Sequence, residues 1–254
     1  MDRKPLFLLS NDDGVSAPGL QALIGMLRPM ASLFVVAPDK ARSGAACAIT
    51  SDVPVSQRLL HAEEGLTVYA CSGMPADCVK LALDQLLQSG PDMVIGGINH
   101  GRNDSINANY SGTLGVVREG ALHGIPSVAF SLSNHSLDAD FSAMQPYVER
   151  IVALTLSEGL PYGTCLNVNF PDGGTYSGIR VCRMAYGRWI DEFSPCEHPR
   201  GGHYYWLGGE QVNDEPDDPD TDAWALEHGY VAITPTTVDV TDYRLKSQLE
   251  DWDF

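Results

Sequence analysis

The chain of 254 residues can bury one sizeable core, and its 44% apolar content, 25 glycines and 16 prolines exclude a disordered or fibrous protein. The formal net charge of −17 argues against a protein that binds nucleic-acid backbones, because such a protein needs a basic face. The same charge repels an anionic substrate at long range, so a phosphate ester would need a local cation or helix N-termini to hold it.

Short apolar runs alternate with helical patterns over the first two thirds of the chain, which predicts β–α units on a parallel sheet. The predicted strands lie at residues 5–9, 33–37, 66–70, 93–98, 127–131 and 165–170. The predicted helices lie at residues 18–27, 75–87, 114–123 and 144–156. The first two helices open at Pro18 and Pro75, and proline suits the first helical turn.

The composition changes after about residue 181. Residues 188–207 are rich in aromatic side chains, and residues 210–222 carry seven carboxylates and no basic residue. A late strand is predicted at 229–234, followed by a polar tail at 245–254. We predict a catalytic core at residues 1–181 and an extension at residues 182–254, which is too thin to bury its own aromatic side chains. The run Tyr204–Trp206 suits nucleobase stacking but favours an oligomer interface.

Polar side chains follow three of the predicted strands. Asp12 and Asp13 come directly after the first strand, Ser43 follows the second across a loop, and Asn99 follows the strand at 93–98. The carboxyl ends of parallel strands share one edge of a sheet, and oxygen donors of these kinds are the ligands that Mg²⁺, Mn²⁺ and Ca²⁺ prefer. The NDDG segment is also a good turn, but adjacent acids repel one another unless a cation lies between them.

The SGT segment Ser111–Thr113 leads directly into the predicted helix at 114–123. Ser or Thr at such a point is first of all a cap, yet a helix start where glycine lets backbone N–H groups approach also suits a phosphate. The glycine-rich segment 96–103 is neither a Walker loop nor a GxGxxG fingerprint, which argues against NAD and ATP-hydrolysing P-loop proteins. His100, within this segment, is a candidate for general acid–base catalysis or for a positioning role.

These segments together resemble the survival-protein E (SurE) family of 5′/3′-nucleotidases. The resemblance rests on SNDDG (10–14), VVAPDKARSG (35–44), SGMPADCVKLAL (72–83), GGINHGRN (96–103), YSGTLGVVREGALHGIPSVAFS (110–131) and GYVAITP (229–235). It runs in order over nearly the whole chain, and the combination is very specific. The chain departs from the commoner wording at Arg102, where proline is usual, and at 45–47, which bears on the preferred base.

The resemblance implies a three-layer α/β/α core with a Rossmann-like, mixed and mostly parallel sheet. It also implies a C-terminal oligomerisation extension, exchanged between the subunits of a homodimer or homotetramer. One divalent cation per subunit, Mn²⁺ or Mg²⁺, or Ca²⁺ in crystals, would be held by Asp12, Asp13, Ser43 and Asn99. The family's phosphate-binding positions map onto Asn103, Ser111, Gly112 and Thr113.

The implied activity is hydrolysis of nucleoside 5′- and 3′-monophosphates, with short polyphosphate as a side substrate. A metal-activated water would attack the phosphorus, and Asp12 or Asp13 would orient it. One alternative is a covalent aspartyl-phosphate phosphatase assisted by Lys80, although such enzymes usually carry two acids one residue apart. The other alternative is a nucleotide-binding regulator without turnover.

The sequence also predicts where the protein works. No stretch approaches the roughly 20 apolar residues that span a bilayer, and the apolar run Leu6–Leu9 is too short for a signal-peptide core. The six cysteines contain no CxxC pair, so they are interpreted as core filler in a reducing compartment. We expect a cytoplasmic protein with no membrane partner and no nucleic-acid partner.

Overall fold

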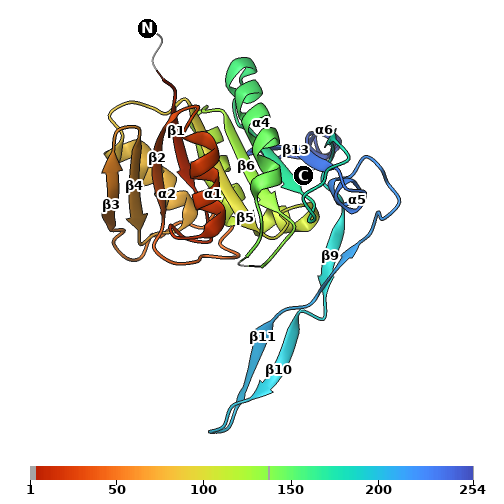
Figure 1. The fold of residues 1–254 in the computed structure, drawn as a ribbon. Helices are drawn as coiled ribbons and strands as arrows, with labels where there is room; N and C mark the ends of the chain where they lie inside the picture. Colours follow the sequence, from red (N-terminus) through yellow and green to blue (C-terminus); the bar gives the residue numbers. More distant parts are fainter. Residues whose placement is uncertain (1–3, 137, 254) are drawn as a thin grey trace.

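The computed structural model describes residues 4–136 and 138–253, which form a central sheet with helices on both faces and a long hairpin arm (Figure 1). The nine strands of the sheet follow the order β3 (Gln57–Glu63), β4 (Leu66–Cys71), β2 (Ser32–Pro38), β1 (Leu6–Ser10), β5 (Met93–His100), β6 (Ser127–Leu132), β7 (Thr164–Phe170), β13 (Val231–Thr237) and β8 (Ile179–Val181). From β4 through β2, β1, β5 and β6 to β7, each strand runs parallel to its neighbour. Strand β3 runs antiparallel to β4, and β13 runs antiparallel to β7. The predicted α/β fold with a mixed, mostly parallel sheet is confirmed.

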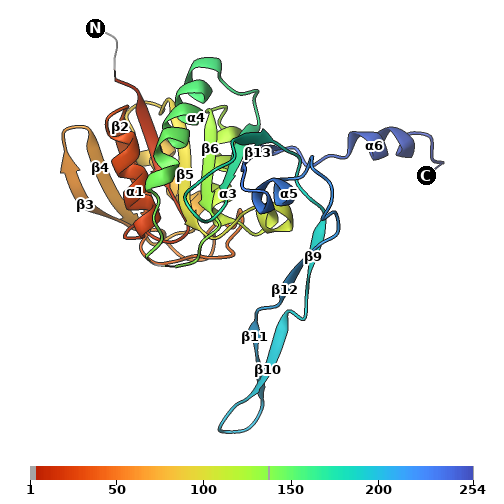
Figure 2. The ribbon, with the colours of Figure 1, turned by 45° about the vertical axis from the view of Figure 1, so that its right-hand side comes forward.

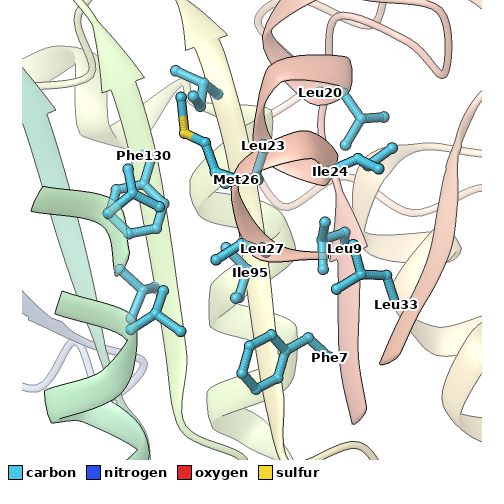
Figure 3. Close-up of a cluster of buried hydrophobic side chains, with 14 of the residues drawn as sticks. Phe7, Leu9, Leu20, Leu23, Ile24, Met26, Leu27, Leu33, Ile95 and Phe130 are labelled. Atoms are coloured by element: carbon cyan, nitrogen blue, oxygen red, sulfur yellow. The ribbon is translucent and has the colours of Figure 1, made fainter. Parts of the chain in front are cut away.

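Two hydrophobic clusters hold the three layers together. Helices α1 (Pro18–Leu27) and α4 (Gln145–Glu158) pack on one face of the sheet, and α2 (Pro75–Leu81) and α3 (Gly112–Leu122) pack on the other. Successive strand residues point to opposite faces, so Phe7 and Leu9 of β1 join the first cluster (Figure 3) and Leu8 joins the second.

Helix α1 shows why its position could be predicted from the sequence. Pro18 occupies its first turn, and Leu20, Leu23, Ile24 and Leu27 form one buried face. That face lies against the first cluster, beside Phe7 and Leu33 (Figure 3). The apolar period and the proline in the first turn therefore agree with the tertiary packing, and the bounds match the predicted 18–27.

Several segments differ from the sequence prediction. The helix predicted at 75–87 is α-helical only to Leu81, and a π-helical turn at Ala82–Leu86 follows, with Leu87 N donating to Ala82 O at 2.9 Å. Strand β3 was missed because all seven of its residues are exposed, so it lacks an apolar alternation. Part of the segment predicted as a polar tail is helix α6 (Tyr243–Leu249), whose start is capped by Asp242.

The segment after residue 181 contributes both to the sheet and to the arm. Strand β13 pairs with β7 along six residues, so the central sheet takes a strand from the segment expected to be an extension. The physical reason is the apolar run at the start of β13, which is buried between β7 and β8. Helix α5 (Asp222–Glu227) precedes this strand. No helix of the described residues is long and apolar enough to cross a bilayer.

The arm is one long hairpin with two successive pairs of strands, and α6 projects separately (Figure 2). Its base pairs β9 (Gly187–Ile190) with β12 (Glu210–Asn213), and its tip pairs β10 (Phe193–Glu197) with β11 (His203–Leu207). Tyr204, Tyr205 and Trp206 on β11 are 42%, 60% and 67% exposed, and α6 has no buried residue. The exchange of this segment between subunits stays a prediction.

Candidate active site

A cavity of about 720 Å³ opens where the parallel strands end at their carboxyl side. The connections after β1 and β2 and the last residues of β5 bring the four expected metal ligands to its wall, which are Asp12, Asp13, Ser43 and Asn99. These residues are separated by up to 87 positions in the sequence and meet only because the sheet is wound as predicted. The volume lies within the range of small-molecule sites.

Asp12 is enclosed by the first turn of α3. Its side chain is 4% exposed, and Thr113 Oγ1 donates a hydrogen bond to Asp12 Oδ1 at 2.5 Å. Burial raises the pKa of Asp12 to about 6, and the neighbouring charge of Asp13 adds to the rise. A carboxylate held in this way is costly to ionise unless a cation lies beside it.

Asp13 is held by His100, the last residue of β5. Its Oδ2 accepts from the backbone N of His100 at 3.1 Å and lies 3.4 Å from His100 Nδ1. The other ring nitrogen of His100 is buried without a hydrogen-bond partner among the described residues, and the ring packs edge-on against Phe141. His100 therefore sits where it positions Asp13, and a role in proton transfer stays a prediction.

The amide oxygen of Asn99 faces Thr113, the hydrogen-bond partner of Asp12. The amide nitrogen of Asn99 donates to Gly101 O at 2.8 Å, so the amide oxygen points the other way, to 3.4 Å from Thr113 Oγ1. The donors at this point are thus carboxylate, amide and hydroxyl oxygens. No group of three His, Cys, Asp or Glu side chains able to hold a metal occurs in the described residues, so neutral donors are needed. This set fits a hard divalent cation better than zinc.

The residues expected to bind phosphate divide into two groups. Asn103 and Ser111 line the cavity, whereas Gly112 and Thr113 lie behind Asp12 and are absent from the cavity wall. Asn103 Nδ2 donates to Ser131 Oγ at 2.9 Å, which anchors the side chain from beneath. Ser111 Oγ accepts from Leu114 N at 3.0 Å, which is a helix cap. Direct phosphate contact by these residues stays a prediction.

Comparison with known proteins decides the family. The family model described as Survival protein SurE matches residues 7–191 of this chain.

The chain belongs to the SurE family.

Relatives named 5′-nucleotidase SurE cover almost the whole chain. The relative from Phocaeicola vulgatus is 57% identical, covering 98% of this chain and 97% of its own length. The relative from Bacteroides fragilis is 50% identical, covering 99% of both. The crystal structure of the SurE protein from Aquifex aeolicus superposes with a TM-score of 0.82 at 34% identity, covering 97% of this chain and 98% of that one.

Several residues of this SurE cavity were missed by sequence reasoning. They are Asn107, Tyr110, His135, Trp189, Glu192 and Gln211. His135 follows β6 at the same edge of the sheet, so the strand-end rule that found Asp12 would also have found it. Trp189 and Gln211 come from the base of the arm, whose return to the cavity has no signal in the sequence.

Arg102 is the only lysine or arginine among the described residues that line the cavity. Its Nε donates to Asp104 Oδ1 at 2.6 Å, and a second guanidinium nitrogen donates to the other oxygen of the same buried carboxylate. The pair fixes the plane of the guanidinium. The chain therefore holds a fixed guanidinium group, paired with a buried carboxylate, at the wall of the cavity.

Proposed function

We propose that this chain is a divalent-metal-dependent nucleotidase that hydrolyses nucleoside 5′-monophosphates, and 3′-monophosphates, to nucleoside and phosphate. Its relatives carry the name 5′-nucleotidase SurE at up to 57% identity over nearly the full chain. The observation that carries the proposal is the convergence of oxygen donors from three strand ends on one cavity, namely Asp12, Asp13, Ser43 and Asn99. Short polyphosphate is a second substrate in this proposal.

The side chains of the cavity have separate roles in this proposal. A bound divalent cation would neutralise charge on the phosphoryl group and lower the pKa of a water molecule. Thr113 holds Asp12 through its hydrogen bond, and His100 holds Asp13 through its backbone N–H. Asp13 is the more exposed carboxylate, with 20% of its side chain accessible, so it is the one placed to orient the attacking water. In this proposal Asn103 and Arg102, which line the same cavity, would bind the phosphate.

The contacts of Asp12 and Lys80 count against a covalent mechanism with Asp12 as the nucleophile. Asp12 is buried, and its Oδ1 already accepts from Thr113, so this oxygen is poorly placed to attack phosphorus. Lys80, the proposed assistant, does not line the cavity and is paired with Glu119, at 2.8 Å between Nζ and Oε1. Water attack is therefore the better proposal.

Phosphate release from AMP tests the proposal and separates it from a regulator without turnover. We expect release with added Mn²⁺ or Mg²⁺ and less than about 1% of that rate in EDTA, because the site holds two carboxylates that need a counter-charge. A panel of 5′- and 3′-nucleotides and tripolyphosphate defines the substrate range. Full activity in the chelated sample would remove the metal-dependent mechanism.

The arm supports a second part of the proposal, namely a homodimer or homotetramer. Tyr205 and Trp206 on the arm are too exposed for a surface that only water contacts. We expect a mass above that of one 27.5 kDa chain in light scattering, and a lower mass for the double variant Tyr205→Ser, Trp206→Ser. A wild-type monomer would contradict this assignment.

A further inference from the structure

The base of the hairpin arm supplies a part of the cavity wall that the carboxylate site does not use. Trp189 of β9 and Gln211 of β12 are direct partners in the antiparallel register. Side chains of such partners lie on the same face of a hairpin. Both line the cavity, together with Asn107 of η2 (Ser105–Asn109).

Two hydrogen bonds connect these three side chains. Trp189 Nε1 donates to Asn107 Oδ1 at 3.2 Å, and Asn107 Nδ2 donates to Gln211 Oε1 at 2.8 Å. An indole N–H can only donate, so the atom of Asn107 that faces it has to be the oxygen. The nitrogen of Asn107 then faces Gln211, and Gln211 has to turn its own oxygen toward it. The tryptophan thus determines the orientation of both amides.

The consequence is a defined chemical surface. The nitrogen of Gln211, Nε2, makes no hydrogen bond to the described residues and is not enclosed, so its N–H groups are available to a ligand. The N–H of Trp189 is already used, so the indole offers only its apolar ring. A flat apolar ring beside a hydrogen-bond donor suits a planar heterocycle that carries an acceptor on its edge.

We propose that Trp189, Asn107 and Gln211 form the nucleobase subsite and that it prefers 6-oxopurines, as in IMP and GMP, over adenine. This inference rests on the proposed nucleotidase activity of the same cavity. A 6-oxopurine presents acceptors at O6 and N7, whereas adenine presents a donor amino group in place of O6. The amide nitrogen of Gln211 therefore faces an acceptor when the base is a 6-oxopurine and a second donor when the base is adenine. Gln211 reads the base, and Asn107 and Trp189 are positioning residues.

The ratio of kcat/KM for IMP to that for AMP tests the subsite, with phenyl phosphate as a reference substrate that has no base. We expect wild type to favour IMP by roughly tenfold, the usual discrimination of one well-placed polar contact. Gln211→Glu presents an acceptor to the base, so the ratio should fall below one. Gln88→Glu adds the same charge at an exposed position outside the cavity and should keep the wild-type ratio.

Trp189→Phe tests the positioning role. Phenylalanine keeps a flat ring but removes the N–H, so both amides can turn and the ratio should move toward one. If Trp189→Phe keeps the wild-type ratio, Trp189 does not orient the two amides. Equal kcat/KM for IMP and AMP in wild type, or an unchanged ratio in Gln211→Glu, would overturn the subsite.

A binding measurement separates this inference from the proposed activity. Calorimetric titration of IMP and AMP into EDTA-treated protein should give the same preference without any turnover. If wild type hydrolyses none of the three phosphate esters but binds IMP more tightly than AMP, the activity fails and the subsite stands. Equal binding of the two nucleotides to wild type would overturn the subsite whatever the turnover.

Discussion

Replacing Asp13 by asparagine is expected to lower turnover by roughly 100-fold or more, the loss that follows when one electrostatic group of a catalytic site is removed. Asparagine keeps the shape of the side chain and its place beside His100 N, but it is a weaker ligand for a hard cation. Asp12→Asn should cause a similar loss. In both variants the fold should persist, because neither side chain belongs to the hydrophobic clusters.

The melting shift on adding Mn²⁺ shows whether the two carboxylates hold the cation. A cation at 100 times its Kd stabilises the fold by about 2.7 kcal/mol, which for a chain of this size is about 5–10 °C. Wild type should show such a shift, and Asp12→Asn and Asp13→Asn should lose most of it. An unchanged shift in both variants would place the cation elsewhere, and the NDDG segment would then be only a turn.

The pH dependence of the chelated protein provides a second measurement on the same residue. Because burial raises the pKa of Asp12 to about 6, the folded state keeps its proton where the unfolded state has already lost it. The contribution of Asp12 is therefore present below pH 4 and is lost as the pH rises from about 4 to 6, by about 3 kcal/mol. In EDTA, Asp12→Asn should gain stability relative to wild type over this interval. A constant difference between the two proteins would contradict the assignment.

Much of the site could be read from the sequence because one rule of parallel sheets governs it. Asp12, Ser43 and Asn99 were placed together by the expectation that strand ends share an edge, and the structure brings them to one cavity. The helix at 18–27 was equally accessible, since Pro18 and the apolar period agree. In both cases, local chemistry and the global fold point to the same answer.

The features that the sequence did not predict depend on tertiary packing, which no local sequence pattern indicates. Ser111 was expected to be a cap or a phosphate ligand, and the cap is what the structure shows. The hydrogen bond from Thr113 to Asp12 spans 101 residues, so no spacing predicts it. Trp189 lies in the aromatic segment 188–207 that was assigned to the extension, but its indole reaches Asn107 and the cavity. The antiparallel return of β13 was hidden because its neighbour β7 lies far earlier in the chain.

Replacing Gly112 by alanine is expected to lower turnover by roughly 100-fold through a displaced Asp12, since misplacing a reacting group by 1 Å costs about that much. A Cβ at Gly112 would lie 2.6 Å from Asp12 Cβ and 2.9 Å from Asp12 Oδ2. Both distances are too short, so the carboxylate has to move. The backbone itself accepts alanine, because Gly112 begins α3 without a positive φ angle. The steric effect is therefore directed at Asp12.

The matched control for Gly112→Ala is Gly25→Ala in α1. A Cβ at Gly25 would meet nothing within 4 Å, so this change should add up to about 1 kcal/mol of helix stability and leave turnover unchanged. Two ligands then separate the roles of Gly112. If it only makes room for Asp12, Gly112→Ala should reduce the melting shift with Mn²⁺ more than the shift with inorganic phosphate. A reduced phosphate shift with a normal Mn²⁺ shift would instead mean that Gly112 admits the phosphate to the helix start, and wild-type turnover would refute both roles.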